Sequence, residues 1–593
     1  MKIYRISFLL IVVVVLLTQT TYGKSKQQKA KLTHQQQQTL LKLIEKEAAN
    51  FDRDEHMFLE QLPAYQYHTD ATSGKFHHIR SSFQYALALL NSGKRAYRDS
   101  AFEVIRKTLT LQDQDLKSPT CGVWPYYLEE PFKTKKSPPD YNMADFNAVT
   151  LIEIWMNHEA VLPTDIKQNL RKGLLLAAQA IKKRSVSNGY TNIALMGTYV
   201  TYMAAQISED QDMLLYAKKR LKSFYDYSLR KGGFTEYNTP HYTVVALDEL
   251  NRMQLFISDK NDRIMVDSLY FMGWDMLARH YHAPSGQSVG PHSRVYTSFV
   301  SRGYSNFVQV ALGFKDTVPA ESVYSFRTYG RTRHQVPKSL RHYFTALEFP
   351  RTEIDIFEPD TPQIVGTAYL SKEFALSSCN QAVLWNQRRP LIAYWGRKSN
   401  PKYLQIRFLH DNYDFSSASV TTHQSENKVL AAINFNLGLG DKHILIDMIK
   451  NGKFEASDLR LRFEFGNTKL PSDLVLPTQL NQPITFSTDS LWFDINIFEA
   501  AFNKNMGYWE KGANATSSWI DYVLYKDKRT EFDLNQLHKV ITAFTLSMNN
   551  YEPKHEIAPS FSYDGPYLNA TWGDLKIKVS ADVQKVKKHG GWF

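Results

Sequence analysis

The chain has 593 residues, of which 43% are hydrophobic and 22% are charged, a composition that excludes an intrinsically disordered or fibrous protein. Its two cysteines, Cys121 and Cys379, are too far apart for a metal knuckle or a redox motif and too few for a disulfide scaffold. The formal net charge of +12 favours anionic partners, although the sequence has no recognisable motif for binding nucleic acid.

The first 23 residues have the three regions of a secretory signal peptide. Lys2 and Arg5 precede an apolar run at residues 6–17, and small or polar residues follow as far as Gly23. The run has twelve residues, whereas a transmembrane helix needs about 20. We therefore expect a cleaved signal at residues 1–23 and a secreted or periplasmic protein, with an uncleaved membrane anchor as the alternative. Removal of Lys2 and Arg5 would lower the net charge from +12 to +10.

Residues 24–314 are predicted to form one helical domain. Apolar residues recur there at three- and four-residue spacing and β-branched runs are few, as in amphipathic helices. Short loops between the helices favour antiparallel pairs that can arch into an incomplete (α/α) toroid. The expected helices lie at residues 39–49, 83–92, 97–111, 146–159, 170–182, 193–206, 210–229, 244–256, 264–280 and 304–312.

A change of pattern near residue 315 predicts a second domain. Residues 315–348 are basic and irregular and are interpreted as an interdomain linker. From 349 to 593, short alternating segments separated by turn residues indicate an antiparallel β-sandwich. The clearest strands lie at residues 382–385, 391–394, 403–408, 428–435, 443–449 and 459–465. The predicted fold class is α+β multidomain, an N-terminal incomplete (α/α) toroid followed by a C-terminal antiparallel β-sandwich.

The most informative segment is residues 232–242, Gly-Gly-Phe-Thr-Glu-Tyr-Asn-Thr-Pro-His-Tyr, which directly precedes an expected helix. Loops on a rigid helical scaffold are favoured sites for catalysis. Capping by Asn238 and Thr239, with Pro240 in the first turn, would explain part of this sequence. Capping does not explain the polar and aromatic side chains around it, which are Glu236, Tyr237, His241 and Tyr242.

Two further polar turns stand at similar intervals. Residues 187–192, Ser-Asn-Gly-Tyr-Thr-Asn, open the expected helix at 193–206, and Asn192 lies fifty residues before Tyr242. Taken alone, Asn192 would more often be a helix cap. Residues 286–296 contain a Gly-Pro turn followed by a polar cluster. The members of that cluster are His292, Arg294 and Tyr296.

These three turns are expected to converge. Each lies near a helix start, and the intervals between them correspond to about one helix pair. In a toroid built from such pairs, equivalent turns meet at one end. The sequence therefore predicts an active site at that end.

The residues of the three turns resemble those of the heparinase II/III-like polysaccharide lyases and the related alginate and chondroitin lyases, which combine an α/α toroid with an antiparallel β-sandwich. In this resemblance Asn192 matches the asparagine that neutralises the substrate carboxylate, and Tyr242 matches the catalytic tyrosine. Thr239 replaces the serine of a Ser-Pro-x-Tyr element, and Thr243 stands where a histidine often follows the tyrosine. His241, directly before the tyrosine, partly compensates for that difference.

Two other elements carry the resemblance further. A histidine near the start of the family's sandwich is matched by His410, although the usual His-x-His-like element is absent and a place beside Asp411 on a strand end is the alternative. His292 is the stronger histidine candidate. The Gly-Pro-His-Ser-Arg element is similar to that of polysaccharide lyase family 27, which cleaves rhamnose-capped glucuronate from arabinogalactan.

The resemblance implies β-elimination at a 4-O-linked uronic acid. Removal of the C5 proton places additional negative charge on the neighbouring carboxylate, which Asn192, helped by Arg294 or His292, would stabilise. Tyr242 is assigned as the acid and as a candidate base, with His292 or His241 as the alternative base. Because a free tyrosine has a pKa of about 10, a cation such as Arg294 would have to favour its phenolate.

Sugar binding is also predicted from aromatic residues, which form 13% of the chain. Trp124 and Tyr190 are candidate stacking residues, for which core packing is the alternative. Glu236, Asn238 and Tyr296 complete the predicted substrate-binding set. The expected partner is an acidic polysaccharide, with no nucleic acid and no membrane contact beyond export. No spacing predicts a metal site, so we expect no required cofactor, with a structural divalent metal as the alternative that the sequence leaves open.

Two other functions stay open at this point. A glycoside hydrolase on the same toroid would need two carboxylates, which Glu129, Glu130, Asp145, Glu236 and Asp248 could supply. The three turns concentrate asparagine, histidine, arginine and tyrosine instead, which favours the lyase. A non-catalytic glycan-binding protein would account for the aromatic content but not for the His-Arg-Tyr cluster.

Overall fold

A computed structural model describes residues 32–62, 68–314, 324–348, 350–360, 362–437, 449, 451–502, 507–554 and 557–585. The predicted signal peptide lies outside these residues, as does nearly all of the strand expected at 443–449. None of the helices within the described ranges combines the length and the hydrophobicity needed to span a membrane.

The chain divides into two compact units, each made of three segments. Unit 1 comprises Met1–Tyr227, Val245–Met272 and Gln309–Gln335, and unit 2 comprises Ser228–Val244, Gly273–Val308 and Val336–Phe593. The domain boundaries expected near residues 314 and 349 stay a sequence prediction.

Every helix expected from the hydrophobic periodicity is present, with bounds that differ by a few residues. They are α2 (His34–Glu47), α3 (Ile79–Asn91), α4 (Arg98–Thr110), α5 (Asn142–His158), α6 (Thr164–Arg184), α7 (Thr191–Ser208), α8 (Gln211–Lys231), α9 (Pro240–Phe256), α10 (Lys260–Arg279) and α11 (Arg302–Ala311). The sequence did not predict the short helix α12 (Arg341–Thr345) or the three-stranded sheet of β1 (Phe51–Asp52), β2 (Met57–Gln61) and β3 (Lys75–His77).

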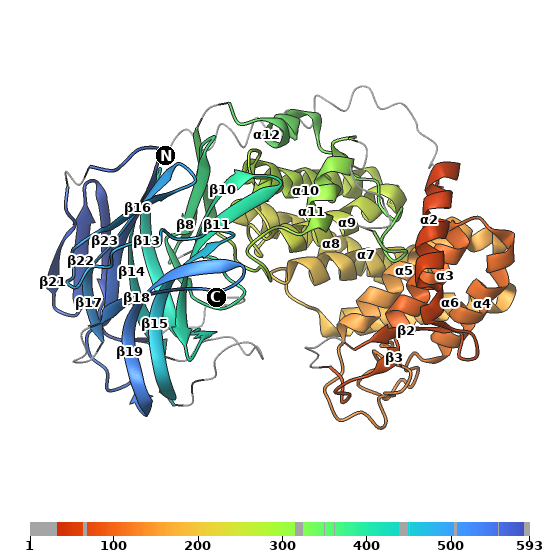
Figure 1. Ribbon diagram of the computed structural model, residues 1–593. Coiled ribbons are helices and arrows are strands. Elements are labelled where there is room, and N and C mark those ends of the chain that lie inside the picture. Colours follow the sequence, from red (N-terminus) through yellow and green to blue (C-terminus); the bar gives the residue numbers. More distant parts are fainter. Residues whose placement is uncertain are drawn as a thin grey trace. The chain divides into compact units, whose positions relative to one another are not determined.

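The helices of unit 1 form two layers. Helix α5 contacts both α3 and α7, whereas α4 contacts α3 and α6, and α6 contacts α5 and α7. Helix α7 is apolar around most of its circumference and buried along nearly its whole length, while α4 and α6 bury only one stripe. Helices α3, α5 and α7 are thus the inner layer (Figure 1), which confirms the predicted (α/α) toroid arrangement.

Unit 2 contains two large antiparallel sheets. One has the order β18-β19-β15-β11-β10-β8-β7-β6, with β12 beside β11, and the other has the order β16-β17-β20-β14-β13-β9, with β24 parallel to β14. The strands are β6 (Arg351–Glu358), β7 (Ile364–Leu370), β8 (Phe374–Cys379), β9 (Gln381–Val383), β10 (Leu391–Arg397), β11 (Asn400–His410), β12 (Tyr413–Asp414), β13 (Ala418–Ser425), β14 (Lys428–Leu437), β15 (Lys453–Gly466), β16 (Ile484–Thr488), β17 (Leu491–Phe502), β18 (Tyr508–Ala513), β19 (Ser517–Asp533), β20 (Val540–Asn549) and β24 (Gln584–Lys585).

The hydrophobic core of unit 2 lies between these sheets and confirms the predicted sandwich. Alternate residues of each strand face it, and Phe463 of β15 meets Phe544 of β20 edge to face, with ring centroids 5.2 Å apart. A smaller sheet of β21 (Ser560–Asp564), β22 (Tyr567–Trp572) and β23 (Leu575–Ser580) packs on the other side of β14 (Figure 1).

Removing the Phe463 ring tests the importance of this core. Phe463 is fully buried, so we expect Phe463→Ala to lower the free energy of unfolding by about 3–5 kcal/mol, because it loses apolar burial and leaves a cavity. Ile354→Ala is the matched control, since Ile354 is 51% exposed on β6 and should change stability by less than about 1 kcal/mol. Urea denaturation followed by tryptophan fluorescence measures both; equal effects would contradict this description of the core.

Candidate active site

Two of the three predicted turns are joined in unit 2 by hydrogen bonds along their length. The Tyr237 carbonyl accepts hydrogen bonds from the Ser293 amide at 3.3 Å and the Ser293 hydroxyl at 2.7 Å. The Thr239 hydroxyl donates to the Arg294 carbonyl at 2.6 Å. Thr239 therefore ties the turns together, where the sequence suggested a helix cap, and helix α9 begins directly at Pro240.

Asn238 is the centre of this junction. Its backbone is left-handed, with φ 45°, and its buried side-chain amide donates to the Val289 carbonyl at 2.7 Å and lies 3.1 Å from His280 Nδ1. His280 Nε2 lies 2.7 Å from the Asp355 carboxylate, on strand β6. Burial alone would raise the pKa of Asp355, but His280 and Arg279 hold it below its usual value. The predicted substrate contact Asn238 is thus occupied in holding the loop.

Four side chains of the two joined turns form a cluster that we call the tyrosine site: Glu236, Tyr242, Arg294 and Tyr296. The hydroxyl groups of Tyr242 and Tyr296 share a short hydrogen bond. The Arg294 guanidinium lies 4.8 Å from the centroid of the Tyr242 ring, and its Nη2 is 3.4 Å from the Tyr296 hydroxyl. Its Nη1 is 3.4 Å from Glu236, and both of these side chains are nearly buried. Tyr296 is 55% exposed, so the hydroxyl pair lies at the surface above a buried ion pair.

The protonation state of Tyr242 follows from these neighbours. Burial is the largest influence and raises its pKa; the Tyr296 hydroxyl acts in the same direction, whereas Arg294 opposes both. The net pKa lies above the usual value for tyrosine. Tyr242 therefore carries its proton at neutral pH and is suited to donate it.

The three candidate histidines have different surroundings. His241 is exposed, and its ring meets that of Tyr242 nearly edge-on at 5.2 Å. His292 is buried, with Nδ1 2.6 Å from the Asn238 carbonyl, and burial lowers its pKa to about 4. His410 ends strand β11, where its Nε2 lies 2.7 Å from the Glu455 carbonyl and 3.5 Å from Asp411. His410 thus has the strand-end position that the sequence offered as its alternative.

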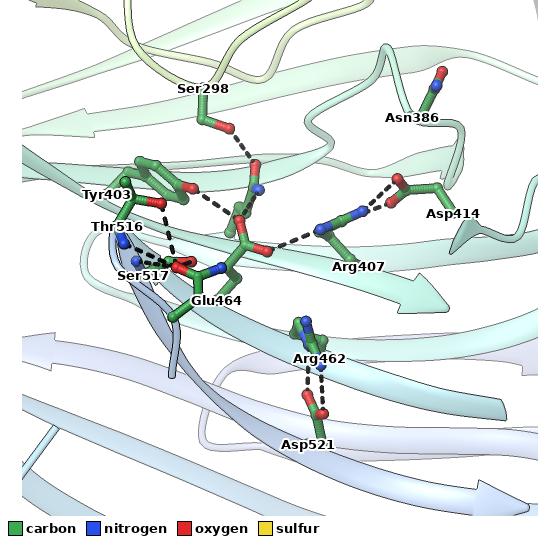
Figure 2. Close-up of polar contacts among 12 residues, drawn as sticks. Ser298, Asn386, Tyr403, Arg407, Asp414, Arg462, Glu464, Thr516, Ser517 and Asp521 are labelled. Atoms are coloured by element: carbon green, nitrogen blue, oxygen red, sulfur yellow. Dashed lines mark hydrogen bonds and ion pairs between the residues drawn. The ribbon is translucent and has the colours of Figure 1, made fainter. Parts of the chain in front are cut away.

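The chain just after the 286–296 turn is hydrogen-bonded to the face of the large sheet that points away from the sandwich core (Figure 2). Ser298 donates to Gln405 Oε1 at 2.8 Å, and Gln405 Nε2 donates to Glu464 at 2.7 Å. Glu464 also accepts hydrogen bonds from Tyr403 at 2.8 Å and from Arg407 at 2.9 Å. Burial alone would raise the pKa of Glu464, but Arg407 and these hydrogen bonds lower it, so the carboxylate stays ionised.

The same turn presses closely on the sheet at Gly290. A Cβ atom there would lie 2.5 Å from the Ile392 side chain and 2.9 Å from the Ser377 hydroxyl, so only glycine fits. Together with the Ser298 hydrogen bonds, this contact fixes the path of the chain on both sides of Arg294 and Tyr296.

The third predicted turn belongs to unit 1. Asn192 is buried in the first turn of α7, and its Oδ1 accepts no hydrogen bond from the residues that the structure describes. Tyr190 directly precedes that helix, and its carbonyl accepts from the Ala194 amide at 2.8 Å. Trp124 is fully buried and its indole donates to the Thr108 carbonyl at 3.0 Å, so it is a core residue, which corrects the expectation that it stacks on a sugar.

The acidic residues considered for a hydrolase have structural partners. Glu129 and Asp248 lie 2.6 and 2.8 Å from histidine nitrogens, and Glu130 accepts two backbone N–H groups at 2.8 and 3.0 Å. Asp145 is buried, which raises its pKa to about 7. Glu236 pairs with Arg294. Within the described ranges, no group of three or more histidine, cysteine, aspartate or glutamate side chains is placed to hold a metal ion.

Sequence reasoning missed Gln387, Gln405 and Glu464. Gln387 Oε1 accepts a hydrogen bond from Arg294 Nε at 2.9 Å, and its carbonyl accepts from the Val295 amide at 2.7 Å. Gln387 follows strand β9 in an ordinary polar turn, and the other two are polar positions on strands β11 and β15, on the face of the large sheet opposite the sandwich core. No local pattern distinguishes such residues, because their role depends on what the sheet brings beside them.

Comparisons with known proteins give the following matches. A family model described as a domain of unknown function (DUF8769) matches residues 50–342. No curated protein sequence shows a significant match. Among solved structures, a chondroitin AC lyase of Streptomyces coelicolor A3 in complex with chondroitin sulphate is 9% identical, with 93% of this chain and 85% of that chain covered and a TM-score of 0.49. A heparinase III is 10% identical, with 96% and 94% covered and a TM-score of 0.37, and a glycoside hydrolase is 9% identical, with 83% and 68% covered and a TM-score of 0.24.

The burial of His292 predicts a pH-dependent stability. Its folded-state pKa of about 4 lies below the unfolded value of about 6.5, so the folded state binds fewer protons between these values. The contribution of His292 to the free energy of unfolding is complete above pH 6.5. It is lost as the pH falls toward 4, at a rate of up to about 1.4 kcal/mol per pH unit. His292→Asn keeps an N–H donor for the Asn238 carbonyl but cannot titrate. The free energy of unfolding, measured by urea denaturation at several pH values between 4.5 and 7, should therefore depend less steeply on pH in this variant.

Ser293→Ala is the matched control for His292→Asn. It removes the neighbouring hydrogen bond to the Tyr237 carbonyl but no titratable group. It should lower the free energy of unfolding by about 1 kcal/mol at every pH and leave its dependence on pH unchanged. An unchanged slope in His292→Asn would contradict the buried, neutral state of this histidine.

Proposed function

We propose that this protein is a polysaccharide lyase that cleaves a 4-O-linked, glucuronate-type uronic acid glycan by β-elimination. The observation that carries the proposal is the tyrosine site, in which two surface tyrosine hydroxyls share a hydrogen bond beside a buried arginine. A β-elimination needs a group that protonates the leaving glycosidic oxygen, a base for the C5 proton, and charge stabilisation at the carboxylate.

Tyr242 is the proposed acid. Its raised pKa keeps the proton on the hydroxyl until the leaving oxygen develops negative charge. Arg294 stabilises the phenolate that results, because its guanidinium lies over the Tyr242 ring and beside the Tyr296 hydroxyl. Tyr296, exposed beside Tyr242, can return a proton to the Tyr242 phenolate through the shared hydrogen bond and regain its own proton from solvent.

His241 is the proposed base among the histidines. It is exposed next to Tyr242, whereas His292 is enclosed between the two turns and His410 lies on a strand end. Asn192 is proposed to neutralise the substrate carboxylate by donating hydrogen bonds from its side-chain NH2 group; its carboxamide oxygen accepts no hydrogen bond within the described chain. Asn192 lies in unit 1 and Tyr242 in unit 2, so kinetics of the two variants must test whether they act together.

The remaining features of the proposal follow from the sequence. The substrate is an acidic polysaccharide, rhamnose-α-1,4-glucuronate of arabinogalactan being the specific candidate, and the enzyme acts after export, in the periplasm or outside the cell. No cofactor is proposed, because proton transfer and charge stabilisation can be performed by the side chains named.

The decisive experiment distinguishes elimination from hydrolysis. The protein is incubated with uronate-containing polysaccharides, and the ultraviolet absorbance of a 4,5-unsaturated product is followed together with new reducing ends. Elimination produces both signals. Reducing ends without the absorbance would establish a hydrolase, and binding without either signal would establish a glycan-binding protein.

Replacement of Tyr242 by phenylalanine tests the assigned acid. Tyr242→Phe keeps the ring beneath Arg294 but has no proton to donate, so we expect kcat to fall by about 10²–10⁴-fold while KM changes little. Tyr551→Phe is the matched control, because Tyr551 is 71% exposed and lies outside the two joined turns. Near-full activity of Tyr242→Phe would eliminate the assignment.

Neutralising Arg294 tests the proposed stabilisation of the phenolate. Changing Arg294 alone would leave Glu236 as an unpaired buried charge, so the variant is the double substitution Arg294→Gln and Glu236→Gln. Without the guanidinium the pKa of Tyr242 rises further, and activity should fall while its alkaline limit moves to higher pH. The pH profile of kcat measures this; an unchanged profile with full activity would remove Arg294 from the mechanism.

A further inference from the structure

A second group of charged side chains lies among the inner helices of unit 1. Glu153 of α5 accepts hydrogen bonds from Arg252 of α9 at 2.7 Å and from Arg331 at 2.7 and 2.9 Å. Arg252 also donates to Glu249, one turn earlier on α9, at 2.7 Å. All four side chains are more than nine-tenths buried. These residues are called the inner charge cluster, together with Arg80 and Tyr199 described next.

Arg80 adds a guanidinium without adding a carboxylate. It lies in the first turn of α3, with its guanidinium 4.2 Å from the centroid of the Phe146 ring on α5. Within the described part of the chain, Arg80 makes no hydrogen bond and no ion pair, and its Nε is buried. Burial lowers its pKa to about 10, and Arg331 and Arg252 reinforce this decrease by repulsion. Arg80 therefore adds a guanidinium without a carboxylate of its own to a cluster in which Arg252 also interacts with Asp248.

Other polar atoms of the cluster also lack partners. Tyr199 of α7 is fully buried, and its hydroxyl has no hydrogen bond to the described residues. Its interactions with Glu153, Arg252, Glu249 and Arg331 place it in the same cluster. The second carboxylate oxygen of Glu249 is likewise unbonded within the described ranges. A buried polar group left unsatisfied costs about 1–3 kcal/mol, so several such groups together indicate a binding site.

We propose that the inner charge cluster binds one singly charged oxyanion of an acidic sugar, a uronate carboxylate or a sulfate ester, with Arg80 as its main ligand. The Phe146 ring covers one face of the guanidinium and leaves its N–H edge available, the geometry that pairs with two oxygens of an oxyanion. The oxyanion supplies the negative partner that Arg80 lacks in the described part of the chain, and the Tyr199 hydroxyl can donate to it. The assignment rests on the proposed function, for which it supplies a substrate-binding subsite in unit 1.

Sugar binding without turnover tests this site. Sodium glucuronate, glucose 6-sulfate and neutral glucose are titrated into the protein at constant ionic strength by calorimetry, and the shift of the thermal midpoint is recorded. At least one acidic sugar should bind and raise the midpoint, and glucose should do neither. The response to glucuronate compared with glucose 6-sulfate identifies the group that the site accepts. Failure of both acidic sugars to bind would overturn the proposal.

Variants assign the binding to the cluster. Arg80→Gln should weaken binding at least 10-fold and, because it removes an unpaired buried charge, should leave the midpoint of the ligand-free protein unchanged or higher. Tyr199→Phe should weaken binding several-fold and keep the fold. Arg171→Gln, at an exposed position on the outer helix α6, is the matched control and should bind like the unmodified protein. Equal binding by Arg80→Gln, or a lowered midpoint with intact binding, would show that Arg80 is only structural.

Product assays with the unmodified protein, compared with the titrations of the unmodified protein and Arg80→Gln, separate the two proposals. Arg80-dependent binding in a protein that produces no unsaturated product from any uronate glycan would overturn the lyase and retain the oxyanion site. Production of the unsaturated product together with binding that does not depend on Arg80 would retain the lyase and overturn the oxyanion site.

Discussion

The buried ion pair between Arg294 and Glu236 is the interaction on which the candidate active site depends. A guanidinium enclosed by protein needs a carboxylate or oriented oxygens, and Glu236 and Gln387 supply them. With its other nitrogens so held, the guanidinium has a fixed position against the face of the Tyr242 ring and beside the hydroxyl of Tyr296. Two tyrosines at the surface thus share a fixed positive charge, which distinguishes them from the many tyrosines of the core.

The surrounding hydrogen bonds explain how two loops far apart in the sequence hold this geometry. Asn238 links the first turn to the Val289 carbonyl, and Ser298 links the second turn to Gln405 and Glu464 on the large sheet. Each link is a hydrogen bond or a chain of hydrogen bonds from a side chain to a backbone carbonyl or a buried carboxylate. Neither turn can therefore shift without breaking several hydrogen bonds. Preorganisation of this kind is what charge stabilisation in a transition state requires.

Part of the positive charge of unit 1 is used in internal ion pairs. Two arginines of the segment that the sequence analysis interprets as a basic linker are paired within unit 1: Arg327 pairs with Glu47 and Glu60, and Arg331 pairs with Glu153. Arg80 is the exception, because it joins that cluster without a carboxylate of its own. In the proposed function, recognition of an acidic glycan depends on guanidinium groups without a carboxylate of their own, such as Arg80, rather than on the net charge of +12.

The sequence by itself determined the helices, the change to alternating strands, and the two turns at 232–242 and 286–296 that meet, since these depend on periodicity and on local clustering. It did not reveal that Trp124 is enclosed by core residues, that His292 is buried and neutral, or that Thr239 bonds across to Arg294 instead of capping α9. Only the tertiary structure decided these points, because burial and partner choice depend on what other segments bring to a residue. Gln387, Gln405 and Glu464 support the site for the same reason. The folded chain places them beside the two turns, and no local sequence pattern indicates this role.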